Sequence, residues 1–326
     1  MSKPVRLGTI GYGIMGERLL RVARAHDPNV LVSSGAWDPS PGAMARYAKD
    51  FPGAPAFGSL EALLAASDVV HVASPPAYHL DQLEQAVAAG LAVHCEKPLG
   101  VDVAKARAVV ERMEKAGARS AVNFPFTASF ALDQINAWRA AGDLGDLERV
   151  EIEIGFKAWP RPWQMDAVAW LDRRAQGGYT REVVSHFLFA TLRQIGPITM
   201  HSHSVTYPAG EGSETACSAE MTAGGVPVTL TGGVGTTEKP DHNLWILHGS
   251  KGKLRLRDWA IAEKLAADGA WREAEGARPN EEMRPLILKR QLDMVAGMTR
   301  GETGHALASL REAFEVQSLV ETILAG

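Results

Sequence analysis

Cysteine is scarce in this chain of 326 residues, which has only two, Cys95 and Cys217, and no CxxC pair. Two separate cysteines exclude a disulfide framework and fit a reducing compartment, so we expect a cytoplasmic protein. No apolar run reaches the ~18 residues of a transmembrane helix, and residues 1–10 lack the apolar core of a signal peptide. We therefore expect no membrane partner.

An excess of charge of one sign is also missing. The chain has 34 Lys and Arg against 38 Asp and Glu, a net charge of −4, and no long block of either sign. This balance argues against a nucleic-acid partner. Apolar residues at 46% and charged residues at 22% exclude a wholly disordered chain and are typical of a soluble globular protein. The length suggests about two domains of ~150 residues each.

The N-terminal part of the chain alternates short apolar, β-branched runs with helical stretches. Five strands are predicted there: Val5–Ile10, Val30–Ala36, Asp68–Ala73, Leu91–Cys95 and Arg119–Val122. Ser59 and Asp102 are expected to cap two of the intervening helices, and Gly90 and Gly117 to follow the ends of two. The pattern predicts an α/β fold in which residues 1–122 form a Rossmann domain, a doubly wound parallel sheet.

Strand-like segments dominate the rest of the chain after a predicted helix over residues 127–141. They are Glu148–Lys157, Ile198–Tyr207, Thr215–Thr222, Val226–Gly233 and Leu244–His248. Gly224-Gly225 is a hairpin signal, so we expect a large, mostly antiparallel sheet. Two final helices are predicted, Glu281–Met298 and Ala306–Ala325. Residues 123–326 are thus predicted as an α+β domain that binds substrate and, through an uncovered apolar sheet face, forms a homodimer or homotetramer.

A glycine-rich loop, GYGIMG, directly follows the first predicted strand and opens a helix. Gly11 permits the tight turn, Gly13 lets a pyrophosphate approach the backbone, and Gly16 lets helix and strand pack closely. Free amides at the helix start face the phosphates. The cradle consists of Gly11, Tyr12, Gly13, Ile14, Met15 and Gly16. The pattern predicts a bound dinucleotide, although glycine turns also occur in βα units without one.

Asp38 lies 22 positions beyond Gly16, at the end of the second predicted strand. A carboxylate at this place accepts hydrogen bonds from the ribose hydroxyls of NAD and repels the 2′-phosphate of NADP. No Lys or Arg follows directly. We therefore expect NAD as the cofactor rather than NADP. The alternative is that Asp38 only caps a turn before Pro39.

The segment Ala73–Gly100 carries a Ser-Pro pair, a His, an alanine-rich helix that ends in Gly, and Glu-Lys-Pro. These positions are Ser74, Pro75, His79, Gly90, Glu96, Lys97 and Pro98. Together with the glycine loop, they resemble the Gfo/Idh/MocA family of oxidoreductases, named for glucose-fructose oxidoreductase and inositol dehydrogenase. The resemblance is close from residue 5 to about residue 100. It implies cofactor contacts for Ser74, Pro75, His79, Glu96 and Lys97.

Lys97 follows the fourth predicted strand. Because the carboxyl ends of parallel strands face the cofactor crevice, Lys97 is expected to point into the site. Beside an oxidised nicotinamide its ammonium is disfavoured, so we expect it to exchange a proton with a substrate hydroxyl or carbonyl. The resemblance implies the same role, a proton relay or substrate positioning. The alternative is a surface lysine in a turn that ends in proline.

Glu182 and His186 lie four residues apart in GGYTREVVSHFLFATL, so they share one face of a predicted helix. His186 is expected to donate to, or exchange a proton with, a substrate oxygen, while Glu182 binds a neighbouring hydroxyl. The family carries Asp where this chain has Glu182, and the longer side chain indicates a different substrate shape. Packing of His186 within the helix is the alternative. No third ligand accompanies the pair, so we predict no metal.

Trp159, Arg161 and Trp163 lie close together in a loop-like stretch. Aromatic faces pack on sugar rings and guanidinium groups bind hydroxyls or carboxylates, so these residues are a candidate substrate wall. Core or interface packing of the tryptophans is an equal alternative.

These features together predict an NAD(P)-dependent oxidoreductase. It would transfer a hydride between nicotinamide and a carbon of a small-molecule sugar, cyclitol or related polyol, with Lys97 as proton relay. Two alternatives stay open. One is an NAD(P)-binding sensor without turnover, since a fold alone does not establish activity. The other is an NAD-dependent glycosidase, which consumes no net cofactor.

Overall fold

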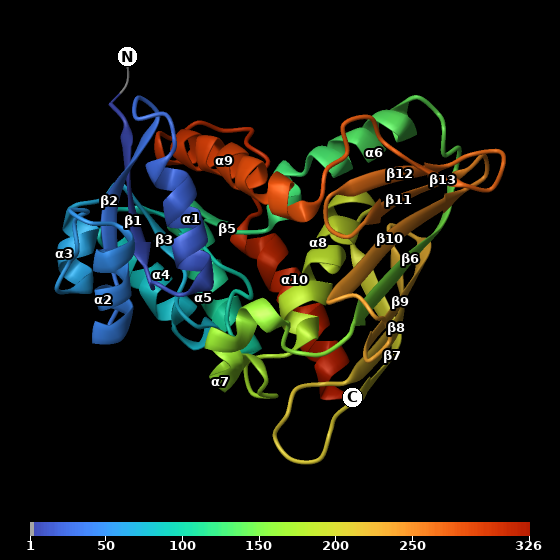
Figure 1. The fold of residues 1–326 in the computed structure, drawn as a ribbon, viewed down its shortest axis with the longest axis horizontal. Helices are drawn as coiled ribbons and strands as arrows, with labels where there is room; N and C mark the ends of the chain where they lie inside the picture. The colour runs from blue at the N-terminus through green and yellow to red at the C-terminus, as the bar shows by residue number, and fades with distance from the viewer. Residues whose placement is uncertain (1–2) are drawn as a thin grey trace. The chain divides into compact units, whose positions relative to one another are not determined.

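The computed structural model describes residues 3–326 and confirms the α/β class. Its first sheet contains β1 (Val5–Ile10), β2 (Leu31–Trp37), β3 (Val69–Val72), β4 (Ala92–Cys95) and β5 (Ser120–Val122). All its strand pairs are parallel, in the order β2-β1-β3-β4-β5. The helices around it are α1 (Ile14–Arg24), α2 (Pro41–Asp50), α3 (Leu60–Ala65), α4 (His79–Ala88) and α5 (Val103–Lys115) (Figure 1).

The helix ends of this sheet follow from single residues. Ser59 Oγ accepts the Ala62 amide at 3.2 Å at the start of α3, and Asp102 accepts the Lys105 amide at 2.9 Å at the start of α5. Both predicted caps are therefore confirmed. The strand order places the point where the winding direction reverses between β1 and β3, so a crevice is expected at the carboxyl ends of these two strands.

The second sheet has eight strands, and all neighbouring pairs except β6 with β9 are antiparallel. They are β6 (Leu147–Phe156), β7 (Ile198–Thr206), β8 (Ala216–Ala223), β9 (Val226–Val234), β10 (Asp241–Gly249), β11 (Lys253–Arg257), β12 (Ile261–Leu265) and β13 (Trp271–Glu273). The mostly antiparallel sheet is confirmed, while β11–β13 are strands that the sequence pattern did not reveal. Gly224 and Gly225 both have positive φ, as the hairpin turn requires.

The remaining helices are short except for the last two. They are η1 (Pro76–Tyr78), η2 (Pro125–Ala128), α6 (Phe130–Ala140), η3 (Pro162–Ala167), α7 (Val168–Leu171), η4 (Thr180–Val184), α8 (Ser185–Gln194), α9 (Asn280–Thr299) and α10 (Leu310–Ala325). The helix predicted over residues 127–141 begins later, at Phe130, because Ser129 Oγ accepts the Leu132 amide. In residues 3–326 no helix is both long and apolar enough to cross a membrane.

The chain forms two compact units. The first contains the residues up to Ala128 and Leu288–Glu315, and the second contains Ser129–Ile287 and Val316–Gly326. These units differ from the predicted division into 1–122 and 123–326, because part of the C-terminal region belongs to the first unit. Leu292 and Val295 are buried in one core with strand residues of β1, and Gln291 donates to the Phe124 carbonyl at 3.0 Å.

Burial alternates along the strands of the second sheet, as a half-covered sheet requires. In β9, Val228 and Leu230 are buried while Thr229 and Thr231 are exposed. Figure 1 shows α6 and α8 on one face, and no helix of the described chain covers the other. The β9 residues on the open face are thus polar, whereas β10 places Leu244 and Ile246 on that face, opposite Glu153 and Glu151 of β6. Association itself stays a prediction.

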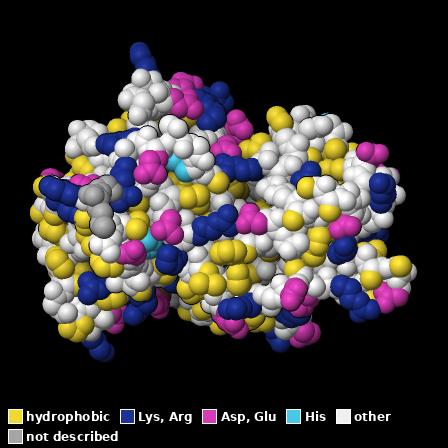
Figure 2. Space-filling view, turned by 90° about the horizontal axis from the view of Figure 1, so that it is seen from above, with side chains coloured by type: hydrophobic (Ala, Val, Ile, Leu, Met, Phe, Trp, Pro, Cys, Tyr) yellow, Lys and Arg dark blue, Asp and Glu magenta, His cyan; other side chains and the backbone are white. Residues whose placement is uncertain are grey.

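Lys and Arg side chains are interspersed with Asp and Glu on the face seen in Figure 2. Apolar side chains lie between them without covering that face. The view contains no continuous basic stripe of the kind that follows a nucleic-acid backbone.

Candidate cofactor and substrate sites

The loop between β1 and α1 has the backbone geometry of a phosphate cradle. Gly11 has φ +90°, and a Cβ there would lie 2.8 Å from the Ser74 amide nitrogen, so only glycine fits where the loops after β1 and β3 touch. A Cβ on Gly16 would overlap the Gly11 carbonyl oxygen. A Cβ on Gly13, in contrast, would meet nothing within 4 Å. Gly11 and Gly16 thus allow close packing, whereas Gly13 leaves open space in front of the loop.

The start of α1 adds donors to this open space. Gly13 is the N-cap of α1, and no side chain caps the helix there. The amides of the first turn are therefore available to an anion at the positive end of the helix. Ile14 and Met15 are half-exposed beside them. The cradle fits a dinucleotide pyrophosphate, at the edge of the sheet where the winding reverses.

Tyr12 takes part in the cradle through its backbone only. Its ring is fully buried between Tyr47 and Phe51, and its hydroxyl donates to Asp50 at 2.8 Å. Its amide donates to Asp38 Oδ2 at 2.8 Å. The side chain of Tyr12 is therefore a core residue that fixes the loop.

Asp38 connects the glycine loop to the start of α2. One carboxylate oxygen accepts the Tyr12 amide and the other accepts the Ser40 amide, each at 2.8 Å. The side chain is half-buried. Arg46, which the sequence did not single out, donates to the Tyr12 carbonyl at 2.8 Å from α2. Asp38 and Arg46 thus bind the two backbone polar groups of Tyr12 and place opposite charges beside the cradle.

His79 joins the segments that follow β3 and β4. Its Nδ1 lies 2.8 Å from the Pro98 carbonyl oxygen, and its Nε2 lies 2.7 Å from the Ser74 carbonyl oxygen. Burial lowers the pKa of His79, and a neutral imidazole donates to only one of these carbonyls at a time. Ser74 Oγ donates to Gln82 at 2.6 Å, and Pro75 directly precedes η1. His79, Ser74 and Pro75 therefore fix the backbone at the carboxyl edge of the parallel sheet, next to Lys97.

A buried polar network lies directly before Lys97. Glu96 accepts from Asn123 Nδ2 at 2.7 Å and lies 3.4 Å from His71 Nε2. His71 in β3 and His94 in β4 are paired residues of adjacent strands, and their Nδ1 atoms are 3.2 Å apart. All four side chains are nearly or fully buried. Lys97 itself is half-buried at the end of this network.

The charges in this network follow from its contacts. Burial alone would raise the pKa of Glu96, but the adjacent His71, the hydrogen bond from Asn123 and the nearby Lys97 lower it. Burial, together with His71, lowers the pKa of His94 to about 3. Glu96 is therefore an ionised carboxylate and His94 a neutral imidazole. His71 and His94 were missed because VVHV and AVHC each read as ordinary strand sequence.

The motif of the second unit starts in a π-helical turn. Glu182 lies in η4, a π-helix, and His186 follows in the first turn of α8. The two residues are thus not on one regular α-helix, which corrects the predicted geometry of the pair. Single π-turns inside helices are frequent at functional sites.

Glycines and a buried carboxylate set where this turn begins. Gly178 has φ +99°, and an added Cβ would overlap the Glu214 carboxylate. Glu214 Oε1 accepts the Thr180 amide at 2.6 Å, and burial raises the pKa of Glu214. Glu214 was missed because it is distant from the motif in the sequence.

His186 lies against an aromatic side chain that the sequence did not indicate. The ring centroids of His186 and Trp259 are 5.2 Å apart at an interplanar angle of 79°. His186 is buried, while Glu182 and Trp259 are half-buried. The second unit therefore combines an imidazole, a carboxylate and an indole in one region around η4 and α8.

The predicted substrate wall is largely occupied by its own contacts. Arg161 is buried, pairs with Asp241 at 2.6 Å and lies over the Trp163 ring at 4.6 Å. Trp159 packs against Phe156 and Tyr179 in an aromatic cluster. Trp163 is 40% exposed and is the one of the three that presents a large surface. A role in substrate binding stays a prediction for all three.

No group of three or more His, Cys, Asp and Glu side chains in the described part of the chain is arranged to hold a metal ion.

Comparison with known proteins finds the strongest sequence similarity within the first unit. Residues 5–124 match the model of an oxidoreductase family with an NAD-binding Rossmann fold, GFO_IDH_MocA. An inositol 2-dehydrogenase from Corynebacterium glutamicum is 35% identical over 122 residues, which are 35% of this chain and 34% of that protein. The similarity thus spans about a third of the length of such curated relatives.

Solved structures share the fold over the whole chain. An oxidoreductase from Thermotoga maritima has a TM-score of 0.82 at 19% identity and covers 99% of this chain and 96% of its own. The WlbA dehydrogenase from Bordetella pertussis, in complex with NADH and UDP-GlcNAcA, has a TM-score of 0.79 at 20% identity, with 98% and 95% covered. Residues 5–124 are thus similar to the Gfo/Idh/MocA oxidoreductases, in agreement with the motifs of the sequence, and the structural neighbours show that the whole chain shares their fold.

Proposed function

We propose that the chain is an NAD-dependent oxidoreductase that transfers a hydride between nicotinamide and a CH–OH carbon of a sugar, cyclitol or related polyol. The observation that carries the proposal is the open space in front of Gly13, at a helix N-terminus that no side chain caps. The match of residues 5–124 to an NAD-binding oxidoreductase family agrees with it.

The preference for NAD rests on Asp38. Its carboxylate, held by the amides of Tyr12 and Ser40, lies beside the cradle where the adenosine ribose of a dinucleotide is expected. A negative charge at this place disfavours a 2′-phosphate. Arg46 acts in the opposite direction, but its guanidinium already donates to the Tyr12 carbonyl.

Lys97 is proposed to exchange a proton with the reacting oxygen. It follows β4 at the carboxyl edge of the parallel sheet, where cofactors of such folds bind. Bound nicotinamide supplies or accepts the hydride, and the protein orients the substrate and moves the proton. The backbone carrying Lys97 is fixed by the His79 contact to Pro98 and by the buried carboxylate of Glu96.

His186 and Glu182 are proposed to bind the substrate from the second unit. Imidazole and carboxylate groups form hydrogen bonds with the vicinal hydroxyls of a polyol. The similarity to an inositol 2-dehydrogenase supports a cyclitol, and the fold shared with a dehydrogenase that binds UDP-GlcNAcA supports a sugar. A small molecule with several hydroxyls is the common chemistry.

The test is a panel of inositols, free sugars and nucleotide sugars, each incubated with purified protein and NAD or NADP. Formation of reduced nicotinamide with at least one polyol is expected. Aryl glycosides in the same panel separate a glycosidase, which releases the aglycone without net reduction. Binding of NADH without turnover of any compound would identify a sensor and contradict the proposed activity.

A further inference from the structure

The turn between β11 and β12 holds two adjacent residues in a backbone conformation that glycine normally adopts. Asp258 has φ +47° and Trp259 has φ +74°, and no other non-glycine residue in residues 3–326 has a positive φ. Asp tolerates this region, but a bulky residue such as Trp is strained there. Such strain persists only where the surroundings fix the backbone, and it is concentrated at functional sites.

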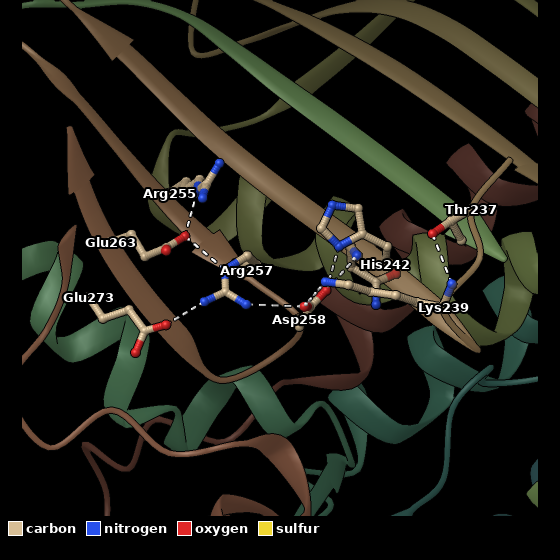
Figure 3. A network of polar contacts seen from close by, with 9 residues as sticks. Thr237, Lys239, His242, Arg255, Arg257, Asp258, Glu263 and Glu273 are labelled. Carbon is tan, nitrogen blue, oxygen red and sulfur yellow. Dashed lines mark hydrogen bonds and ion pairs between the residues drawn. The ribbon is translucent and has the colours of Figure 1, made fainter. Parts of the chain in front are cut away.

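Asp258 is the residue through which the surroundings fix this turn (Figure 3). Its Oδ1 accepts from His242 Nδ1 at 2.8 Å and from the Asn243 amide at 3.2 Å. Its Oδ2 lies 3.4 Å from Lys239 Nζ and 3.3 Å from Arg257 Nη1. The Asp258 amide donates in return to the Asn243 carbonyl at 2.9 Å. Asp258 thus bonds with the start of β10 and the end of β11.

The network continues away from the turn along the edge of the sheet. Arg257 also pairs with Glu263 in β12 and with Glu273 in β13 (Figure 3). These contacts join three successive strands beside Asp258. The turn is therefore held by hydrogen bonds and ion pairs with residues of the sheet.

Trp259, the second residue of this turn, contacts the helix layer that packs on the sheet. Its indole meets the His186 imidazole edge to face at 5.2 Å and the Phe187 ring at 5.4 Å. Both partners belong to α8, whose Thr191 hydroxyl accepts the indole N–H of Trp245 in β10 at 2.9 Å. An edge-to-face contact restricts the rotation of the imidazole ring. The strained backbone of the turn thus places the half-buried indole of Trp259 against the buried imidazole of His186.

We infer that Trp259 is a positioning residue for His186, and that the strained Asp258–Trp259 turn exists to hold the imidazole in the orientation that the substrate requires. The inference rests on the proposed function only in that His186 contacts the substrate. Neither Trp259 nor Asp258 belongs to the motifs that point to the family. A packing role alone does not require a positive φ at a bulky residue, because the strain lowers the stability that packing provides.

The experiment compares Trp259→Leu, Trp259→Phe and Asp258→Ala in the full chain. Trp271→Leu is the matched control, since Trp271 lies in the same sheet and its ring is covered by Arg255 at 4.0 Å. The first readout is the ring-carbon NMR signal of His186 in protein labelled at histidine, assigned with His186→Gln. The second is kcat and KM for the polyol found in the substrate panel. Thermal melting of each variant reports stability separately.

Trp259→Leu is expected to move the His186 signal and to lower kcat/KM by about tenfold to a hundredfold, since misplacement of a reacting group costs rate in this range. Trp259→Phe is expected to retain most of the activity. Asp258→Ala keeps the indole but removes its support, so it should move the same signal. Trp271→Leu should leave the signal and kcat/KM within about twofold of the wild type.

An unmoved His186 signal in Asp258→Ala, or equal kcat/KM losses in Trp259→Leu and Trp271→Leu, would overturn the inference. If Trp259→Leu does not fold, Asp258→Ala and Trp259→Phe decide. If the wild type turns over no compound, the proposed function has failed. The NMR signal in Asp258→Ala then decides the inference alone, because it requires no substrate.

Discussion

His71 Nε2 lies 3.4 Å from Glu96 Oε1, and both side chains are buried in the parallel sheet directly before Lys97. A buried carboxylate is costly unless it is paired and hydrogen-bonded. Here Asn123 donates to the same oxygen at 2.7 Å. The position that precedes the proposed proton relay is thus occupied by an ionised group whose partners come from β3 and from the end of β5.

Replacement of the Glu96 carboxylate is predicted to make the free energy of unfolding less dependent on pH in the acid range. The pKa of Glu96 is lowered in the folded chain, so its stabilising effect is complete above the ordinary Glu pKa and is lost as pH falls through the folded value. Glu96→Gln should lower the free energy of unfolding by about 1–3 kcal/mol at neutral pH. The difference from the wild type should shrink below about pH 4.5. Urea unfolding across this pH range measures both effects.

Glu111→Gln is the control, because Glu111 is exposed on α5 in the same unit. It should change the free energy of unfolding by less than about 0.5 kcal/mol at every pH. A Glu96→Gln difference that stays constant down to acidic pH would contradict the assigned ionisation.

Local signals explain why the first sheet could be predicted from the sequence. Each of its five strands is a short apolar run, and Ser59 and Asp102 mark helix starts by forming caps with their own neighbours. The glycine loop was readable for the same reason, since the positive φ of Gly11 is a local requirement. These features depend on residues that are close in sequence.

The missing features depend on residues far apart in sequence. The strands β11–β13 are short and rich in charged residues, so they were not separable from loops. The His71–His94 pair and the Glu214 contact with Thr180 form only when distant segments meet. The strained conformation of Trp259 depends on the surrounding sheet, and no residue type signals it in advance.

Lys97→Ala is predicted to abolish most of the turnover while leaving cofactor binding measurable. Loss of a general acid or base costs about 10²–10⁴-fold in kcat. Lys97→Arg keeps the positive charge but does not release its proton, so it should be nearly as slow. Stopped-flow turnover and NADH fluorescence titration measure the two quantities. Lys105→Ala, an exposed lysine of α5 paired with Asp81, is the matched control. Wild-type turnover in Lys97→Ala would refute the proposed role.

Asp38→Asn is predicted to weaken the preference for NAD. The amide removes the negative charge that repels a 2′-phosphate, while its oxygen still accepts one of the amides of Tyr12 and Ser40. The ratio of kcat/KM for NADPH to that for NADH should rise by about tenfold, corresponding to ~1.4 kcal/mol. Steady-state kinetics with both cofactors measure it. A wild-type ratio above one would already reverse the cofactor assignment.

Gly13→Ala and Gly16→Ala are predicted to fail in different ways. The Cβ added at Gly13 meets no protein atom within 4 Å, so the free energy of unfolding should change by less than about 0.5 kcal/mol. The same methyl group occupies space required by the pyrophosphate, so NADH affinity should fall about tenfold or more. The Cβ added at Gly16 overlaps the Gly11 carbonyl, and overpacking of this kind costs about 1–3 kcal/mol.

Thermal melting without cofactor and calorimetric titration with NADH separate the two glycines. Gly13→Ala should melt like the wild type and bind poorly, whereas Gly16→Ala should melt at a lower temperature. Gly53→Ala does not serve as a control, because its positive φ of 76° would strain alanine. Gly58→Ala does, since its Cβ also meets nothing within 4 Å and it lies before α3, away from the glycine loop in sequence. Equal NADH affinities of Gly13→Ala and Gly58→Ala would show that the open space at Gly13 does not bind the pyrophosphate.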